Sequence, residues 1–211
     1  MRKQGMSLAA ARPIFVTVFL IVMIISTAIT FILPESYAGT ARVKVEVAPP
    51  AAGPYFFPQT EFEVIQSQIV LDKAIEKLNL NVEWGKKYFN GETLKTAESL
   101  QILKGRLSLA PVRDTKLIAI TVYSDDRREA AAIANAIATA YQDFYLEKQR
   151  PEAAKAAAGA TDAPVVTIID TAEPAAKPCK PNKPLNIALG ALAGMILGSV
   201  AAGVFGLFQR R

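Results

Sequence analysis

The side chains that usually carry enzyme chemistry are sparse in this sequence. It contains no histidine, so the Ser-His-Asp and Cys-His arrangements of nucleophilic catalysis are impossible. Neither a GxxxxGK[ST] phosphate loop nor a GxGxxG motif after a strand pattern is present. The adjacent carboxylates Asp125 and Asp126 follow a predicted strand and precede a predicted helix, where helix capping explains them. We therefore expect no enzymatic activity, no catalytic residues, no cofactor and no metal.

Cysteine chemistry is similarly limited, because the chain has one cysteine. Cys179 cannot form an intramolecular disulfide and has no companions with metal-ligand spacing. An incidental small residue is the simpler interpretation, and a disulfide between subunits stays open.

Small residues at four-residue spacing are the most informative pattern near the C-terminus. Gly190, Gly194 and Gly198 form two overlapping GxxxG steps, and Ala202 continues the series. Such a stripe makes a flat groove that lets helix backbones approach closely in a membrane. We expect it to serve helix packing or oligomerisation, with the partner either the other apolar segment of the chain or a neighbouring subunit.

Two apolar stretches are long enough to cross a bilayer. Residues 14–33 and 185–208 contain no charged residue, and about 20 apolar residues span the hydrocarbon core as a helix. Because both stretches lack ionisable groups, a transport pathway within them is not expected. The first stretch could instead belong to a secretory signal, with Ser36-Tyr37-Ala38 as a cleavage site. It is longer than the usual signal core, which favours a retained anchor.

The charge distribution predicts how the chain is oriented. All 19 acidic residues and 19 of the 24 Lys and Arg lie between the apolar stretches, so the middle is neutral and the net charge of +5 comes from the two ends. The positive-inside rule then places both termini in the cytoplasm and the middle outside the inner (plasma) membrane, in the periplasm of a cell with two membranes. A neutral middle segment also argues against binding nucleic acid.

Hydrophobic periodicity predicts that the middle segment is a small α+β domain with the order β-α-α-β-β-α-β. The clearest signals are strands at residues 41–47, 116–123 and 165–170, and a long helix from Asp126 to about Arg150, with Glu129 as the reciprocal capping partner of Asp126. One helix is expected over 60–79, begun by a capping box of Thr60 and Glu63. A shorter helix over 93–104 is expected to end at Gly105.

Prolines then separate this domain from the second apolar stretch. Pro174, Pro178, Pro181 and Pro184 precede it, and the last three would line one face of a stiff polyproline II stalk. The expected organisation is a cytoplasmic tail (1–13), a first transmembrane helix (14–33), the extracytoplasmic domain (34–173), the membrane-proximal stalk (174–184), a second transmembrane helix (185–208) and a short tail (209–211).

The order of these parts resembles the Wzz-type polysaccharide co-polymerases, also called chain length determinant proteins. The resemblance rests on the two terminal spans around an external domain and on four stretches in order: Glu61–Leu80, Thr115–Ile120, Ala130–Ala136 after Asp125-Asp126, and Ile169–Pro174 leading into the proline-rich segment and the glycine-rich span. It implies a ring-like homo-oligomer that regulates the chain length, polymerisation or export of a surface polysaccharide such as lipopolysaccharide, together with a polymerase or export machinery.

The resemblance leaves two further roles open. Some family members carry a cytoplasmic tyrosine kinase domain and others act as separate partners of such a kinase, so a membrane adaptor or activator of a kinase is one alternative. A generic extracytoplasmic sensor or secretion accessory is another. The chain also departs from the family, because residues 151–164 leave little room for a tall helical extension, and we expect no kinase domain to be fused after Arg211.

Overall fold

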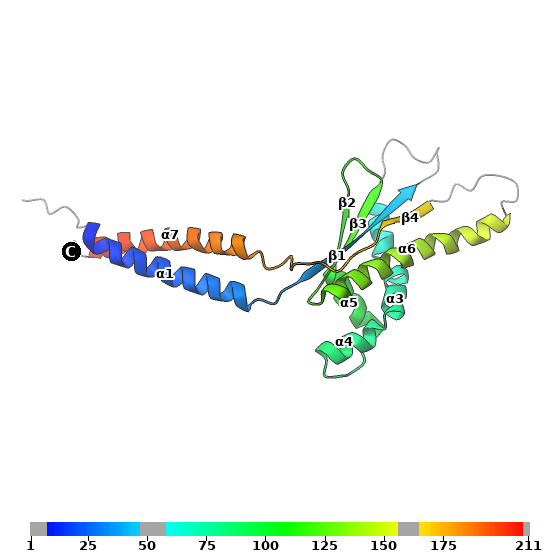
Figure 1. Cartoon of the computed structure of the whole chain (residues 1–211), viewed down its shortest axis with the longest axis horizontal. Coiled ribbons are helices and arrows are strands. Elements are labelled where there is room, and N and C mark those ends of the chain that lie inside the picture. The colour runs from blue at the N-terminus through cyan, green and yellow to red at the C-terminus, as the bar shows by residue number, and fades with distance from the viewer. Residues whose placement is uncertain (1–7, 47–57, 156–164, 209–211) are drawn as a thin grey trace, which may run out of the picture. The chain divides into compact units, whose positions relative to one another are not determined.

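The computed structural model of the chain describes residues 8–46, 58–155 and 165–208. The chain divides into two compact units, one formed by residues 1–35 with 179–211 and the other by residues 36–178. The described part of the first unit holds two long helices, α1 (Leu8–Ile32) and α7 (Lys183–Phe208). The described part of the second is a mixed α+β domain of four strands and five helices (Figure 1).

The sheet of this domain is antiparallel and has the strand order β2-β3-β1-β4. Its strands are β1 (Tyr37–Glu46), β2 (Leu107–Pro111), β3 (Leu117–Ser124) and β4 (Val165–Asp170). Side chains alternate across the strands as the period of two requires. Alternate apolar residues of the two central strands are buried on one face of the sheet: Ala41, Val43, Val45, Ile118, Ile120 and Val122.

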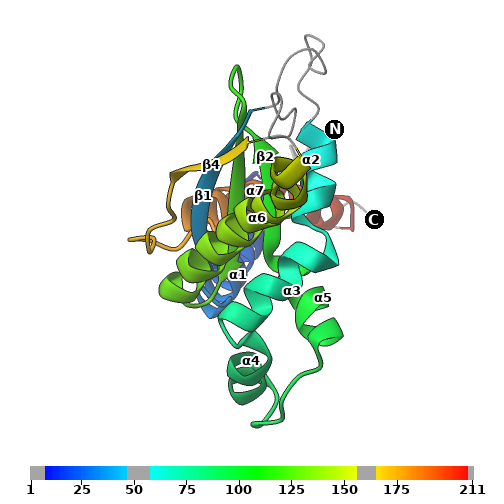
Figure 2. The same cartoon turned by 90° about the vertical axis from the view of Figure 1, so that its right-hand side faces the viewer.

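Helix α6 (Arg127–Lys155) covers that buried face (Figure 2). Its large core residues, Ile133, Ile137 and Tyr141, are fully buried, and Ala134, Ala136, Ala138 and Ala140 are buried between them. Alanine adds little bulk, so this helix can pack against the sheet on one side and against α3 (Gln68–Lys77) on the other. The other face of the sheet is more polar, with Arg42 paired to Asp170 at 2.9 Å across β1 and β4.

The helical segment between β1 and β2 differs most from the sequence-based expectation. The single helix predicted over 60–79 is wrong: the chain forms α2 (Pro58–Ile65) and α3, separated at Ser67, whose φ of −63° and ψ of 150° are extended. Because α2 begins at Pro58, Thr60 does not cap it. Helix α4 (Leu80–Tyr88) then follows a left-handed Asn79. Gly105 lies inside α5 (Thr96–Arg106) and does not end it.

In the first unit, α1 and α7 pack against each other along most of their length. Residues 12–32 and 183–207 are long and apolar enough to cross a membrane, by length and composition. At the ends that adjoin the rest of the chain, the Lys183 ammonium lies 2.9 Å from the Glu35 carboxylate and 5.3 Å from the centre of the Phe31 ring. Lysines and aromatic rings at helix ends are typical of the boundary between hydrocarbon and headgroups.

Candidate functional site

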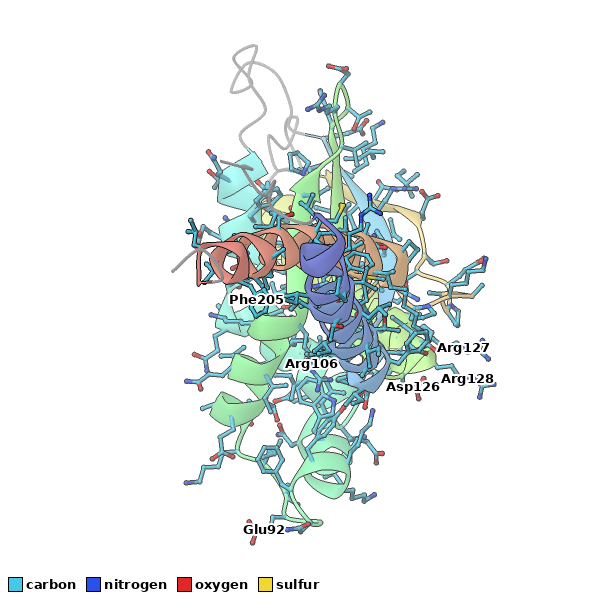
Figure 3. The ribbon with its side chains drawn as sticks, turned by 90° about the vertical axis from the view of Figure 1, so that its left-hand side faces the viewer. Glu92, Arg106, Asp126, Arg127, Arg128 and Phe205 are labelled. Atoms are coloured by element: carbon cyan, nitrogen blue, oxygen red, sulfur yellow. The ribbon has the colours of Figure 1, made fainter. Side chains whose placement is uncertain are left out.

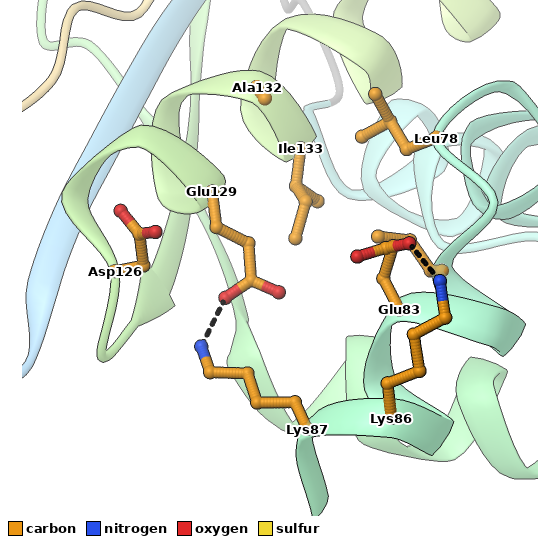
Figure 4. A pocket seen from close by; sticks show the side chains of 9 residues that line it. Leu78, Glu83, Lys86, Lys87, Asp126, Glu129, Ala132 and Ile133 are labelled. Atoms are coloured by element: carbon orange, nitrogen blue, oxygen red, sulfur yellow. Dashed lines mark hydrogen bonds and ion pairs between the residues drawn. The ribbon is translucent and has the colours of Figure 1, made fainter. Parts of the chain in front are cut away.

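A cleft of about 460 Å³ lies between α4 and the first turns of α6 (Figure 4). Its apolar lining consists of Leu78, Leu80, Ala132 and Ile133. Its polar lining consists of Glu83, Lys86 and Lys87 on α4, together with Asp126 and Glu129 from the α6 side. The cleft thus joins two segments that are about 45 residues apart in the sequence.

Glu129 connects the cleft to the domain core. Its carboxylate accepts hydrogen bonds from the indole N–H of Trp84 and the hydroxyl of Ser124, and its side chain is 16% exposed. Lys87 lies 3.3 Å away on the solvent side. Sequence analysis assigned Glu129 to reciprocal capping of Asp126, but its carboxylate is instead held by groups from α4 and the end of β3.

Arg106 lies on the inner side of this cluster. Its guanidinium carbon is 5.0 Å from the centre of the Trp84 ring and 5.1 Å from that of Tyr88, within cation–π range. One guanidinium nitrogen is 3.9 Å from Glu129. Arg127 and Arg128, by contrast, are exposed on the first turn of α6 (Figure 3). Arg106 therefore fixes α5 against α4, whereas the two exposed arginines make no ion pair with the part of the chain that the structure describes.

The carboxylates Asp125 and Asp126 have different roles. Asp126 accepts a hydrogen bond from the backbone N–H of Arg128 at 2.7 Å, which is the capping contact that the sequence predicts for it. Asp125 accepts hydrogen bonds from Lys87 at 2.5 Å and from the Tyr88 hydroxyl at 2.9 Å. Burial opposes ionisation of Asp125, but these hydrogen bonds outweigh it and lower the pKa of Asp125 to about 2.

This shift predicts a loss of stability in acid. The ordinary pKa of Asp125 is 3.8. A carboxyl group whose pKa is lowered by folding contributes stability that is present above pH 4 and is lost as the pH falls toward 2. We expect Asp125→Asn to lower the thermal midpoint at neutral pH and to reduce its fall between about pH 4 and 2, as followed by the fluorescence of Trp84, the single tryptophan.

Asp114, in the turn between β2 and β3, offers the matched control for this prediction. Its side chain makes no ion pair within the described residues, and Asn tolerates its left-handed φ of 58°. An Asp114→Asn variant should keep the acid dependence of the wild type. Equal acid profiles for Asp125→Asn and the wild type would show that the Lys87–Asp125 contact does not stabilise the fold.

A second buried polar cluster holds α2 on α6. The carboxylate of Glu61, on α2, is 8% exposed and accepts hydrogen bonds from the hydroxyls of Tyr141 and Tyr145. Burial and the adjacent carboxylate both raise the pKa of each tyrosine above its ordinary value. Both hydroxyls therefore stay protonated and keep donating to Glu61, which accounts for a carboxylate at this buried position.

The predicted glycine stripe lies on the face of α7 that contacts α1. A Cβ added at Gly190 would lie 2.6 Å from the Cβ of Ser26. A Cβ added at Gly194 would lie 3.0 Å from the Phe19 ring, and a Cβ added at Gly198 would lie 2.9 Å from the Phe15 ring. Ala202 is half-buried. The buried Gly206, four residues further on, was missed although it continues the same spacing. Packing between copies of the chain through this stripe stays a prediction.

The predicted proline stalk crosses the boundary between the two compact units. That boundary falls between Pro178 and Cys179, inside the segment that contains Pro174 and Pro181. Pro184 lies in the first turn of α7, where proline is well tolerated because no helical hydrogen bond needs its missing N–H. Pro184 therefore belongs to α7 and not to the predicted stalk.

The charged groups of the cleft can form hydrogen bonds and ion pairs, both with one another and with a ligand. No group of three or more Cys, Asp and Glu side chains in the described ranges has the arrangement of a metal site. Two carboxylates of the cleft are paired to its lysines, with Glu83 and Lys86 at 3.3 Å and Lys87 and Glu129 at 3.3 Å, and Asp126 caps α6. Such a cleft can present hydrogen-bonding groups around an apolar floor.

Comparison with known proteins finds one segment of the chain that is similar to a described domain family. Residues 138–204 match the GNVR family model, described as a G-rich domain on putative tyrosine kinase. The match runs from the middle of α6 through β4 and the proline-rich segment to most of α7, and it includes the stripe of Gly190, Gly194, Gly198 and Ala202. No curated protein matches the chain. Residues 138–204 are therefore similar to the GNVR domain, which is found in polysaccharide co-polymerases and chain length determinant proteins, and this similarity is consistent with the resemblance of the sequence to the Wzz-type family.

Proposed function

We propose that this protein is a non-enzymatic scaffold of the inner membrane that regulates the length, polymerisation or export of a surface polysaccharide. The observation that carries the proposal is the GNVR match over residues 138–204. The absence of histidine from the sequence and the pairing of Glu83 with Lys86 and of Glu129 with Lys87 in the cleft support a role in binding and organisation.

In this proposal α1 and α7 span the membrane and the α+β domain lies outside the cytoplasm. The length and apolar character of both helices support it. So does the charge distribution, because the five excess basic residues all lie outside the uncharged stretches 14–33 and 185–208, toward the chain ends: Arg2, Lys3, Arg12, Arg210 and Arg211. A ring of several copies acting with a polymerase or export protein completes the proposal.

Deletion of the gene tests the proposal in cells. We expect the length distribution of the surface or secreted polysaccharide, resolved by gel electrophoresis, to shift or disappear in the deletion strain and to return when the wild-type chain is supplied. A deletion strain whose polysaccharide keeps its normal length distribution would exclude this function.

The description of the matched family, a domain on a putative tyrosine kinase, favours a second candidate function. In it the protein is a membrane adaptor that activates a separate cytoplasmic kinase in exopolysaccharide synthesis. The terminal segments, residues 1–12 and 209–211, would then form the docking surface. Replacing the uncharged residues of these segments, with the basic residues that orient the chain kept, should abolish phosphorylation of the kinase if the adaptor function is correct, and should leave polysaccharide length unchanged if the scaffold acts without a kinase.

A further inference from the structure

We propose that the cleft between α4 and α6 binds a neutral saccharide unit of the growing polysaccharide. This inference rests on the proposed function and adds a ligand site to it. The cleft volume of about 460 Å³ falls within the range of about 300–1,000 Å³ that is usual for small-ligand sites. A site of this size holds one or two sugar rings of a longer chain.

The arrangement of the lining matches the chemistry of a sugar ring. A pyranose carries hydroxyl groups around its edge and C–H groups on its faces. The apolar contact for a ring face comes from Leu78 and Ala132, which reach the surface of the cleft, whereas Leu80 and Ile133 are buried beneath them. The rim, with Glu83, Lys86 and Lys87, offers carboxylate acceptors and ammonium donors for hydroxyl groups, and hydrogen bonds to charged groups are the stronger ones.

The pairing of the charges selects a neutral ligand. Lys86 is bound to Glu83, and Lys87 is bound to both Asp125 and Glu129. An anion would have to displace these carboxylates from the lysines and would then lie against them, which is unfavourable. A hydroxyl group needs no such displacement, because a paired carboxylate keeps acceptor sites and a paired ammonium keeps donor hydrogens.

The wall of the cleft is held in place before any ligand binds. Glu129 is fixed by Trp84 and Ser124, and Trp84 is itself fully buried and stacked against Arg106. Fixed polar groups bind with a smaller loss of conformational entropy than mobile ones. The hydrogen bond to Glu129 also makes Trp84, the single tryptophan of the chain, a fluorescent reporter of the cleft.

Ala132 provides a variant that fills the cleft without disturbing the core. It is exposed on α6 and lines the cleft (Figure 4), and leucine is a good helix former, so Ala132→Leu should fold normally. Ala97 on α5 is also exposed and lies outside the cleft lining, so Ala97→Leu is the matched control.

Binding is tested with the full-length protein in lipid nanodiscs. The probe is the neutral, size-fractionated oligosaccharide pool from partial hydrolysis of the surface polysaccharide of the strain that carries the gene, titrated by Trp84 fluorescence and calorimetry. We expect a saturable response in the wild type and in Ala97→Leu, and at least a tenfold weaker affinity in Ala132→Leu. No saturable response, an equal response of Ala132→Leu, or a response to sodium phosphate alone would overturn the inference.

The same variants separate this inference from the proposed function. Supplied to the deletion strain at wild-type protein levels, Ala132→Leu should give a polysaccharide length distribution different from that of Ala97→Leu. If the wild type restores polysaccharide length and Ala132→Leu restores it equally, the saccharide site is wrong while the scaffold function stands. If the wild type itself has no effect on length, the scaffold function fails.

Discussion

Replacing Gly39 by valine should destabilise the α+β domain by about 3 kcal/mol, the upper end of the usual cost of overpacking. Gly39 is buried in β1, where the strand passes directly over α6. A Cβ at this position would lie 2.5 Å from both the carbonyl carbon of Ala130 and the backbone nitrogen of Ala131. Because the obstacle is backbone, no side-chain rotation can relieve the clash, and the sheet would have to move away from the helix.

Thermal unfolding in detergent, followed by Trp84 fluorescence, measures this effect. A loss of about 3 kcal/mol corresponds to a fall in the midpoint on the order of 10 °C for a domain of this size. Gly105→Ala is the control, because Gly105 lies inside α5 with no other atom within 4 Å of a Cβ. This control should gain about 0.5–1 kcal/mol, since glycine is unfavourable in a helix. An unchanged midpoint for Gly39→Val would contradict the close packing of β1 on α6.

Replacing Gly190 by leucine should loosen the contact between α1 and α7, at a cost of about 1–3 kcal/mol. The new Cβ would meet Ser26, whose own Cβ would be 2.6 Å away, so the two helices would have to separate locally. Helix association in a membrane depends on such close approach, because the lipid supplies no hydrophobic drive between apolar helices.

A carbodiimide cross-link between Glu35 and Lys183 reports on this contact. Their charged groups are 2.9 Å apart, close enough for direct coupling of a carboxylate to an amine. The yield of the intramolecular link, measured by mass spectrometry, should fall in Gly190→Leu and stay unchanged in Gly203→Leu, where a Cβ would meet nothing within 4 Å. If the yield stays unchanged in Gly190→Leu while oligomers are lost on native gels, the stripe acts between copies of the chain.

Local pattern was enough to predict much of the fold. The alternating residues of β1 and β3, the β-branched run of β4 and the apolar stripe of α6 are local signals, so these elements lie close to where the sequence indicates them. The helix predicted over 60–79 was wrong because its apolar spacing is almost continuous across Ser67, although the backbone there is extended. Helix α4 had no clear pattern of its own, and its packing beside α5 and α6 depends on tertiary contacts.

The cleft could not be predicted in the same way. Glu129 has a good local role available as a capping partner three residues after Asp126, and nothing near it in the sequence indicates that it would contact Trp84, 45 residues away. The role of Lys87 likewise depends on the placement of α4 beside the end of β3. The glycine stripe, in contrast, was predicted as a pattern, because its four-residue spacing is a local property of one helix.

The central claim is that this chain sets the length of a polysaccharide, and varying its amount tests the claim most directly. The gene would be placed under an inducible promoter in the deletion strain, and polysaccharide length would be resolved by gel electrophoresis at each protein level. A scaffold that regulates chain length predicts a modal length that changes progressively with the amount of protein and reaches the wild-type value at the wild-type level. A length distribution that stays the same at every protein level, with the protein present in the membrane, would contradict the claim.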